Sequence, residues 1–157
     1  SFGSIFSSGS SQAQNAMRSK HAYQGYQQNA AHALENRDYT KQAATQDHHE
    51  ALRALGLNAQ AGRKQSKRNH GARKVRGAAS GLTNSGSRLD ALFDAKHREE
   101  SSILETLNEG RRKAKLRKQR AFEGADKRYR QSKDRLDLGY SQDLEGLSLS
   151  NFNSIFG

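Results

Sequence analysis

The sequence contains no proline, no cysteine and no tryptophan. Without proline, no ring interrupts the helical hydrogen-bond ladder, so helices can extend along the whole chain. Without cysteine, disulfides and thiolate chemistry are excluded, and the redox compartment stays open. Because no run of about 18 apolar residues occurs, one chain cannot span a bilayer with a helix of its own, whereas an oligomer could. The first ten residues also lack the basic and apolar regions of a signal peptide.

Apolar side chains are scarce as well. Hydrophobic residues make up 32% of the 157 residues, the formal net charge is +11, and the mean hydropathy is -1.04. This composition lies close to that of disordered chains, but the regular spacing of the apolar residues argues for helices. A pI near 10.2 indicates an anionic partner, which could be nucleic acid, an acidic membrane surface or an acidic protein.

One long stretch has no acidic residue, and within it the positive charge stops abruptly. Residues 63–76 contain seven Lys or Arg and no Asp or Glu, and residues 77–87 are uncharged and almost entirely Gly, Ala, Ser, Thr or Asn. Gly and Asn tolerate the positive φ that turns require. A small-residue run between two helical patterns therefore predicts that the chain reverses within residues 71–87.

Apolar residues recur at helical spacing on both sides of this reversal. Before it, small residues dominate one heptad position: Ala16, Tyr23, Ala30, Ala44 and Ala51. After it, a stronger stripe uses spacings of three, four, seven or eleven: Leu89, Leu92, Ile103, Leu107, Ala114, Ala121, Ala125, Tyr129, Leu136, Tyr140, Leu144 and Leu147. Gly110, Gly124 and Gly139 lie on or beside this stripe, and each costs up to about 1 kcal/mol relative to Ala. We interpret them as points of close packing against a neighbour, with a kink as the alternative.

These patterns predict an all-α fold. The chain is expected to form an extended antiparallel helical hairpin with a Gly/Ser-rich tip, and side-by-side packing in an oligomer is expected to stabilise this hairpin. The expected segments are an apolar N-terminal arm at 1–11, a first long helical arm at 12–70, the tip at 71–87, a second long helical arm at 88–147 and an apolar C-terminal docking tail at 148–157. The Ala-rich seam contributes little burial per residue, so one hairpin alone is expected to be weakly held.

Two basic clusters are the candidate DNA-facing residues. The first comprises Arg63, Lys64, Lys67, Arg68, Arg73, Lys74 and Arg76, and the second comprises Arg111, Arg112, Lys113, Lys115, Arg117, Lys118 and Arg120. Neither cluster has interleaved aromatics, which favours contact with phosphates over stacking on bases. For the second cluster, pairing with the flanking Glu99, Glu100, Glu105, Glu109, Glu123 and Asp126 is the structural alternative.

The uncharged tip and the two chain ends are further candidate sites. Gly77, Ala78, Ala79, Ser80, Gly81 and Leu82 form a candidate membrane or tip segment that contains a small-xxx-small pattern. Arg76 and Arg88 flank this segment and could hold it at the level of lipid headgroups. The same F-x-S-I-F string occurs at both ends, which makes Phe2, Ile5, Phe6, Phe152, Ile155 and Phe156 candidate docking residues.

No pattern in the sequence indicates an enzyme, a cofactor or a metal site. In His48-His49-Glu50 the adjacent imidazoles point about 100° apart on a helix, whereas a zincin needs His at i and i+4. Residues 71–77 lack both the spacing and the terminal Lys of a phosphate-binding P-loop.

Residues 73–108, RKVRGAASGLTNSGSRLDALFDAKHREESSILETLN, resemble the small internal virion (ejection) proteins of short-tailed, podovirus-type bacteriophages. Such proteins commonly carry a basic stretch, a Gly-Ala-Ser-Gly core, a Ser-Gly-Ser, an acid-Leu pair and a trailing acidic helix. The matching positions here are Gly77, Ser80, Gly81, Ser85, Gly86, Ser87, Leu89, Asp90 and Leu92. The match covers about a quarter of the chain. Some members carry a more apolar segment, and its absence here argues against autonomous membrane insertion.

The resemblance implies a protein stored in the capsid interior near the portal and ejected before the genome into the host cell envelope. There it would join a DNA conduit with further copies of itself, other ejection proteins, and portal or tail components. The resemblance alone supplies the host outer membrane as a partner. Two functions follow as hypotheses: an oligomeric channel through which the DNA backbone passes, or a simpler virion protein that binds and condenses DNA without sequence preference.

Overall fold

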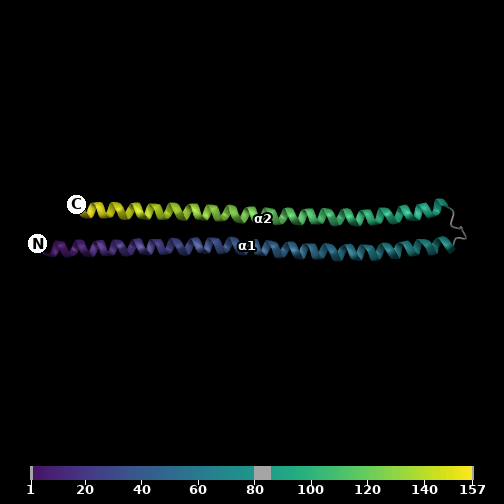
Figure 1. Ribbon diagram of the computed structural model, residues 1–157, viewed down its shortest axis with the longest axis horizontal. Coiled ribbons are helices and arrows are strands. Elements are labelled where there is room, and N and C mark those ends of the chain that lie inside the picture. The colour runs from purple at the N-terminus through teal and green to yellow at the C-terminus, as the bar shows by residue number, and fades with distance from the viewer. Residues whose placement is uncertain (1, 80–85, 157) are drawn as a thin grey trace. The chain divides into compact units, whose positions relative to one another are not determined.

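The computed structural model describes the backbone of residues 2–79 and 86–156 and the side chains of residues 11–79, 86–149 and 152–153. The described residues form two α-helices, α1 (Phe2–Ala79) and α2 (Gly86–Phe156), which pack against each other as in a hairpin (Figure 1). This confirms the all-α fold. The segments 2–11 and 148–156, expected as an arm and a tail outside the helices, are helical, because no proline interrupts either end.

Both helices extend into the segment expected as the tip. Helix α1 continues past Gly71 to Ala79, and α2 already begins at Gly86. Most of the expected tip is therefore helical, and Ser80, Gly81 and Leu82 lie outside the described residues. A run of Gly, Ala and Ser permits a reversal but does not oblige the chain to leave the helix at the first glycine.

Contacts divide the helix pair into two compact units. Unit 1 comprises Ser1–Gln42 and Ala121–Gly157, and unit 2 comprises Ala43–Arg120. In each unit a segment of α1 lies antiparallel to a segment of α2 (Figure 1).

The residues that face the partner helix, which we call the seam, recur every eleven positions. On α2 they include a series of half-buried or buried apolar residues: Leu92, Ile103, Ala114, Ala125, Leu136 and Leu147. On α1 the corresponding series is Ala22, Ala33, Ala44, Leu55, Ser66 and Gly77. Eleven residues in three turns give about 3.67 residues per turn, close to the 3.6 of a straight helix, whereas a heptad needs 3.5. The heptad predicted for the first arm follows the seam only in part: Ala30, Ala44 and Ala51 are half-buried, whereas Ala16 and Tyr23 are exposed.

In unit 2 the seam is built from layers in which a small residue faces a larger one. A Cβ added to Gly110 would overlap the side chain of Leu55. Ser66 Oγ donates a hydrogen bond of 2.6 Å to Glu99 Oε2. The small member of each layer lets the backbones approach closely and increases their dispersion contacts. The close packing predicted at Gly110 is thus confirmed, whereas Gly124 and Gly139 meet no atom within 4 Å of an added Cβ.

In unit 1 aromatic rings connect the helices. The ring of Tyr140 stacks on Tyr26 with centroids 5.0 Å apart and tilts against Tyr23 at 6.0 Å. The hydroxyl of Tyr26 donates a hydrogen bond to Asp137, and this bond raises the pKa of Tyr26 above its ordinary value. Unit 1 therefore combines an aromatic cluster with a polar contact at its edge.

Charged side chains also cross the seam of unit 1. Lys41 Nζ lies 2.7 Å from Asp126 Oδ1, and this hydrogen bond holds the pKa of Asp126 below its ordinary value. The same ammonium lies 5.4 Å from the ring centroid of Phe122, and the guanidinium of Arg37 lies 4.8 Å from that of Tyr129. Such cation–π contacts let basic residues occupy seam positions next to aromatic rings.

The core is thin throughout the described residues. Only four hydrophobic residues are buried, namely Ala59, Leu107, Ala114 and Ala125, and Ser66 is the buried polar residue. Many large apolar side chains are instead exposed: Met17, Tyr23, Leu34, Tyr39, Leu57, Val75, Leu89, Phe93, Leu104, Leu116, Leu138, Leu144, Leu149 and Phe152. A helix pair with so little buried apolar surface gains little from the hydrophobic effect.

Candidate nucleic-acid interface

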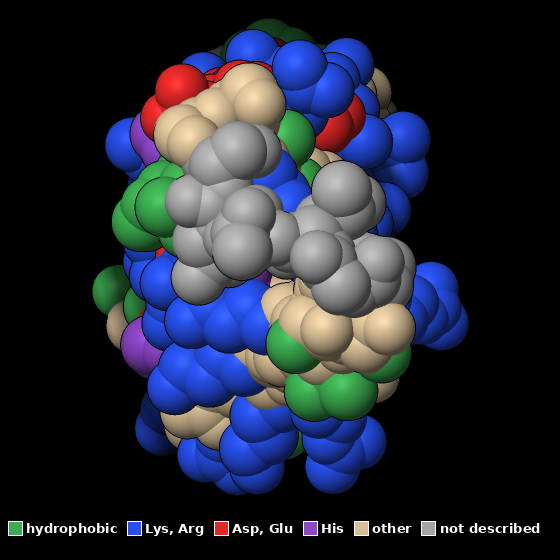
Figure 2. Space-filling model, turned by 90° about the vertical axis from the view of Figure 1, so that its right-hand side faces the viewer, with side chains coloured by type: hydrophobic (Ala, Val, Ile, Leu, Met, Phe, Trp, Pro, Cys, Tyr) green, Lys and Arg blue, Asp and Glu red, His purple; other side chains and the backbone are tan. Residues whose placement is uncertain are grey.

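Positive charge is distributed unequally between the units. Unit 1 contains nine Lys or Arg and eight Asp or Glu, and unit 2 contains eighteen and eight. Ten of the eleven net positive charges therefore belong to unit 2. Figure 2 looks onto the end of unit 2 at which α1 ends and α2 begins. Lys and Arg side chains cover much of the visible surface there, and acidic side chains gather over α2, the upper helix.

The first basic cluster occupies the last turns of α1. Six of its members are exposed, namely Arg63, Lys64, Lys67, Arg68, Lys74 and Arg76. No acidic residue occurs on α1 beyond Glu50, so neighbouring turns cannot neutralise these cations. An exposed cluster of one sign is the electrostatic footprint expected of a phosphate-binding surface.

The remaining member, Arg73, is half-buried and has an acidic partner. Its Nη2 lies 2.5 Å from Glu99 Oε1 of α2. The hydrogen bonds from Ser66 and then from Arg73 hold the pKa of Glu99 below its ordinary value. Arg73 Nη1 is buried with no hydrogen-bond acceptor among the described residues. The structure therefore places Arg73 across the seam, as a residue that holds the two helices together.

The second basic cluster lies on α2 and is almost entirely exposed. Its exposed members are Arg111, Arg112, Lys113, Lys115, Arg117 and Arg120, and Lys118 is half-buried. Lys113 pairs with Glu109 at 3.0 Å on the same helix, and this hydrogen bond lowers the pKa of Glu109. Arg111, Arg112, Lys115, Arg117 and Arg120 form no ion pair with the described residues. The alternative of structural pairing is thus supported at Lys113.

The two clusters do not face each other. The contacts of Ser66 with Glu99 and of Gly77 with Arg88 place the first cluster beside the early turns of α2. The close approach of Leu55 to Gly110 places the second cluster beside the stretch of α1 that precedes the first cluster. The basic surface of unit 2 therefore extends lengthwise along the helices.

The sequence interpretation missed Lys96, a half-buried lysine of α2 outside both clusters. The sequence feature that could have revealed it is a spacing of eleven residues. Lys96, Leu107 and Lys118 follow this spacing and therefore lie on one face of α2. A lone lysine in a mixed-charge sequence does not stand out until this spacing is known.

The described part of the tip is helical and packed. The guanidinium of Arg88 donates a hydrogen bond of 2.8 Å to the carbonyl of Gly77, and an added Cβ on Gly77 would overlap the Arg88 side chain. Gly77 is consequently buried, whereas Ala78 and Ala79 are exposed. Arg88, expected as a headgroup anchor, thus connects the start of α2 with the end of α1, and its role as an anchor stays a prediction. Within the described residues, no helical stretch is both long and apolar enough to cross a bilayer.

The two chain ends lie at the same end of unit 1 (Figure 1). Phe152 is exposed, and the side chains of Phe2, Ile5, Phe6, Ile155 and Phe156 lie outside the described residues. Docking at these residues stays a prediction. Among the described side chains, no three His, Asp or Glu converge as a metal site would require.

Comparisons with family models, with curated proteins and with solved structures find no match to this chain.

Proposed function

We propose that this chain is an internal virion protein of the phage ejection type, which assembles side by side into a channel in the host cell envelope for genome delivery. The observation that carries the proposal is the long basic surface of unit 2. Eleven of the fourteen cluster residues are exposed and have no ion pair among the described residues. Cations left unpaired along two helices suit a polyanion that slides past many weak contacts. The virion, the portal and the outer membrane enter through the resemblance of residues 73–108.

Unit 1 supports the assembly part of the proposal, because its two faces differ. On one side of the helix pair, large side chains follow directly after seam residues. Tyr23 follows Ala22 on α1, and Phe122 follows Ala121 on α2. We call this side the aromatic face. On the other side, glycines come directly before seam residues, and we call this side the glycine face. These glycines are Gly25, Gly124, Gly139 and Gly146. All four have no atom within 4 Å of an added Cβ, so packing inside the chain does not account for them.

The glycine face also carries a groove of about 280 Å³ whose lining includes Ala33, Asn36 and Arg128. Protruding side chains such as Leu34, on the aromatic face, provide matching knobs. A face of knobs and a face of holes on one chain favours head-to-tail contact, in which each copy presents its aromatic face to the glycine face of the next. Repetition of that contact generates a ring when its rotation closes, and a channel requires such a ring.

Cysteine cross-linking tests this packing, because the chain has no native cysteine. Leu34→Cys lies on the aromatic face and Asn36→Cys lies on the glycine face, about 200° apart on α1. With a short bismaleimide, the double variant should give a ladder of covalent oligomers, and each single variant should give no covalent oligomer. Dimers from a single variant would show self-complementary contact and contradict the head-to-tail arrangement.

The channel itself is tested by adding the protein to dye-loaded anionic vesicles and, separately, to labelled duplex DNA. We expect leakage that rises steeply with protein concentration, together with DNA binding that ignores base sequence. The exposed clusters alone also favour the second candidate, a virion protein that condenses DNA. That function predicts DNA binding without leakage. Leakage is therefore the measurement that separates the two, and absence of both activities would reject both.

A further inference from the structure

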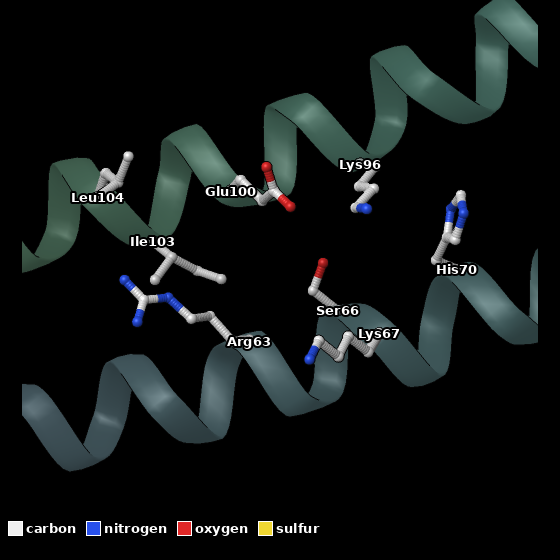
Figure 3. Close-up of a pocket in the computed structure, with 8 residues that line it drawn as sticks. All are labelled: Arg63, Ser66, Lys67, His70, Lys96, Glu100, Ile103 and Leu104. Atoms are coloured by element: carbon white, nitrogen blue, oxygen red, sulfur yellow. The ribbon is translucent and has the colours of Figure 1, made fainter.

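A groove of about 360 Å³ opens between the helices of unit 2 (Figure 3). Arg63, Ser66, Lys67 and His70 of α1 line it together with Lys96, Glu100, Ile103 and Leu104 of α2. The close-up shows Lys96 and Glu100 directed from α2 toward the space between the helices, with Ile103 and Leu104 toward one end and His70 toward the other. The groove thus has a polar part and an apolar part.

Positive charge exceeds negative charge around the polar part. Arg63, Lys67 and Lys96 contribute three cations from two helices, and none forms an ion pair with the described residues. Glu100 is the one carboxylate of the lining. The neighbouring Glu99 is occupied by Ser66 and Arg73. Like charges brought together on two packed helices repel, so the arrangement is stabilised when an anion enters.

An unused polar atom lies at the same place. His70 Nδ1 is buried and has no hydrogen-bond partner among the described residues. A buried polar atom without a partner is costly, and each such atom requires an explanation. An imidazole nitrogen that carries its proton can donate to an anionic oxygen, and a lysine ammonium beside it supplies charge.

We propose that this groove binds one phosphate group of a DNA backbone, with Lys67, Lys96 and His70 around the phosphate oxygens and the deoxyribose against Ile103 and Leu104. The inference rests on the DNA contact of the proposed function and identifies where on unit 2 the backbone is held. It assigns a role to Lys96, which lies outside both basic clusters, and to His70, which lies between the cations of the first cluster.

The surroundings of the groove favour a polymer of phosphates. Lys74 lies one eleven-residue repeat from Arg63, and Arg111 and Lys115 lie one repeat from Glu100 and Leu104. These residues therefore continue the face of the groove in both directions at intervals of about 16 Å. A backbone that leaves one phosphate in the groove would meet the next cations of the same face.

The test compares two variants that remove the same number of charges from the same two helices of unit 2. Lys67→Gln with Lys96→Gln removes two lysines of the groove, and Arg53→Gln with Arg98→Gln removes two exposed cations that belong neither to its lining nor to a basic cluster. Duplex DNA affinity is measured by fluorescence anisotropy from 50 to 200 mM salt. Removing one phosphate contact should reduce the slope of log affinity against log salt concentration by about 0.9. The ratio of wild-type to groove-variant affinity should therefore fall about 3.5-fold from the lowest to the highest salt concentration. The control variant should keep the wild-type slope.

An equal change of slope in both variants would overturn the groove while leaving DNA binding intact. If the wild-type protein fails to bind DNA, the proposed function itself fails. Circular dichroism checks that both variants keep wild-type helicity. If the groove variant loses helicity, Lys67→Arg with Lys96→Arg replaces it, and this variant should retain the slope.

A second measurement examines the groove without DNA. Inorganic phosphate is titrated at constant ionic strength while the ring signals of the six histidines are followed by NMR. Phosphate, compared with chloride, should shift the His70 signals most, and the Lys67→Gln/Lys96→Gln variant should abolish that selective shift. A uniform response of all histidines would overturn the site. A His70 response to anionic vesicles but not to duplex DNA would assign the groove to lipid and overturn the proposal.

Discussion

Units 1 and 2 use the same pair of helices and the same eleven-residue spacing, yet they hold the helices together differently. In unit 1, Tyr26 stacks on Tyr140 and Lys41 pairs with Asp126. In unit 2, Leu55 packs over Gly110, and the polar contacts gather around Glu99. Acidic and basic residues nearly balance in unit 1, whereas unit 2 carries ten net positive charges.

The difference shows how one simple fold can divide its tasks. Where charges balance, lysine and arginine are used inside the seam, as Arg37 and Lys41 are in their contacts with Tyr129 and Asp126. Where basic residues outnumber acidic ones, small residues bring the helices together and most cations remain on the surface. This difference supports the proposal that unit 1 contacts protein and unit 2 contacts an anion.

The largest expected effect is on DNA affinity, and it separates the units. Replacing the seven basic residues of 111–120 by Gln should reduce the slope of log affinity against log salt by about 0.9 for each phosphate that the variant no longer neutralises. At low salt, the loss of DNA affinity can then amount to orders of magnitude. Replacing Lys127, Arg128, Arg130, Lys133 and Arg135 of unit 1 by Gln should change the slope much less. Anisotropy titrations over a salt series measure both. Equal slopes for the two variants would show that the units do not differ in DNA contact.

Helicity of the first variant tests the structural alternative at the same time. We expect it to stay at the wild-type level, because the pair of Lys113 with Glu109 is an exposed i,i+4 contact, and such contacts contribute little to stability. A marked fall in helicity with unchanged DNA affinity would show that the cluster mainly pairs with its acidic neighbours.

Two glycine substitutions should have opposite effects on stability. Gly110→Ala places a methyl group against Leu55, and overpacking of this kind typically costs about 1–3 kcal/mol, offset in part by helix propensity. Gly124→Ala meets open space within the chain and should stabilise the helix by up to about 1 kcal/mol. Urea unfolding at low protein concentration compares them. Stabilisation by Gly110→Ala would contradict the close approach in unit 2.

Alkaline pH should weaken unit 1 through Tyr26. Its hydrogen bond to Asp137 raises its pKa in the folded state, so this stabilisation is present below the ordinary pKa near 10 and is lost as pH rises through the folded value. Tyr26→Phe should remove this part of the pH dependence. Thermal melting of both proteins between pH 8 and 11 provides the measurement, and parallel curves would exclude a role for the bond.

A smaller effect is expected from Glu99 in acid. Its pKa is lowered in the folded state by Ser66 and Arg73, so the stabilisation is present above the ordinary pKa near 4.3 and is lost as pH falls through the folded value. Glu99→Gln should flatten the loss of stability below about pH 4. Asp126→Asn, which removes the corresponding carboxylate of unit 1, serves as the comparison. An unaltered acid profile for Glu99→Gln would show that the network does not stabilise unit 2.

Much of the architecture followed from the sequence. The absence of proline and the recurrent apolar residues predicted two long helices, and the change in composition after Arg76 located the end of the first one. Helix α1 continues to Ala79, nine residues beyond the expected end of the first arm at residue 70. The basic clusters were also visible in the sequence, because runs of Lys and Arg need no partner to be recognised. The sequence by itself therefore determined the features that depend on neighbouring residues along one helix, namely the helices and the basic clusters.

The tertiary structure decided which residues of one helix meet which residues of the other. That register places Arg73 against Glu99 and Gly110 under Leu55, and it gathers Lys67, His70 and Lys96 around one groove. The physical reason is geometric: a seam of small residues contains few large side chains whose positions would reveal it, and 3.5 and 3.67 residues per turn diverge only slowly along a helix. Contacts between residues more than twenty positions apart, as between Arg73 and Glu99, become apparent only once the two helices are packed together.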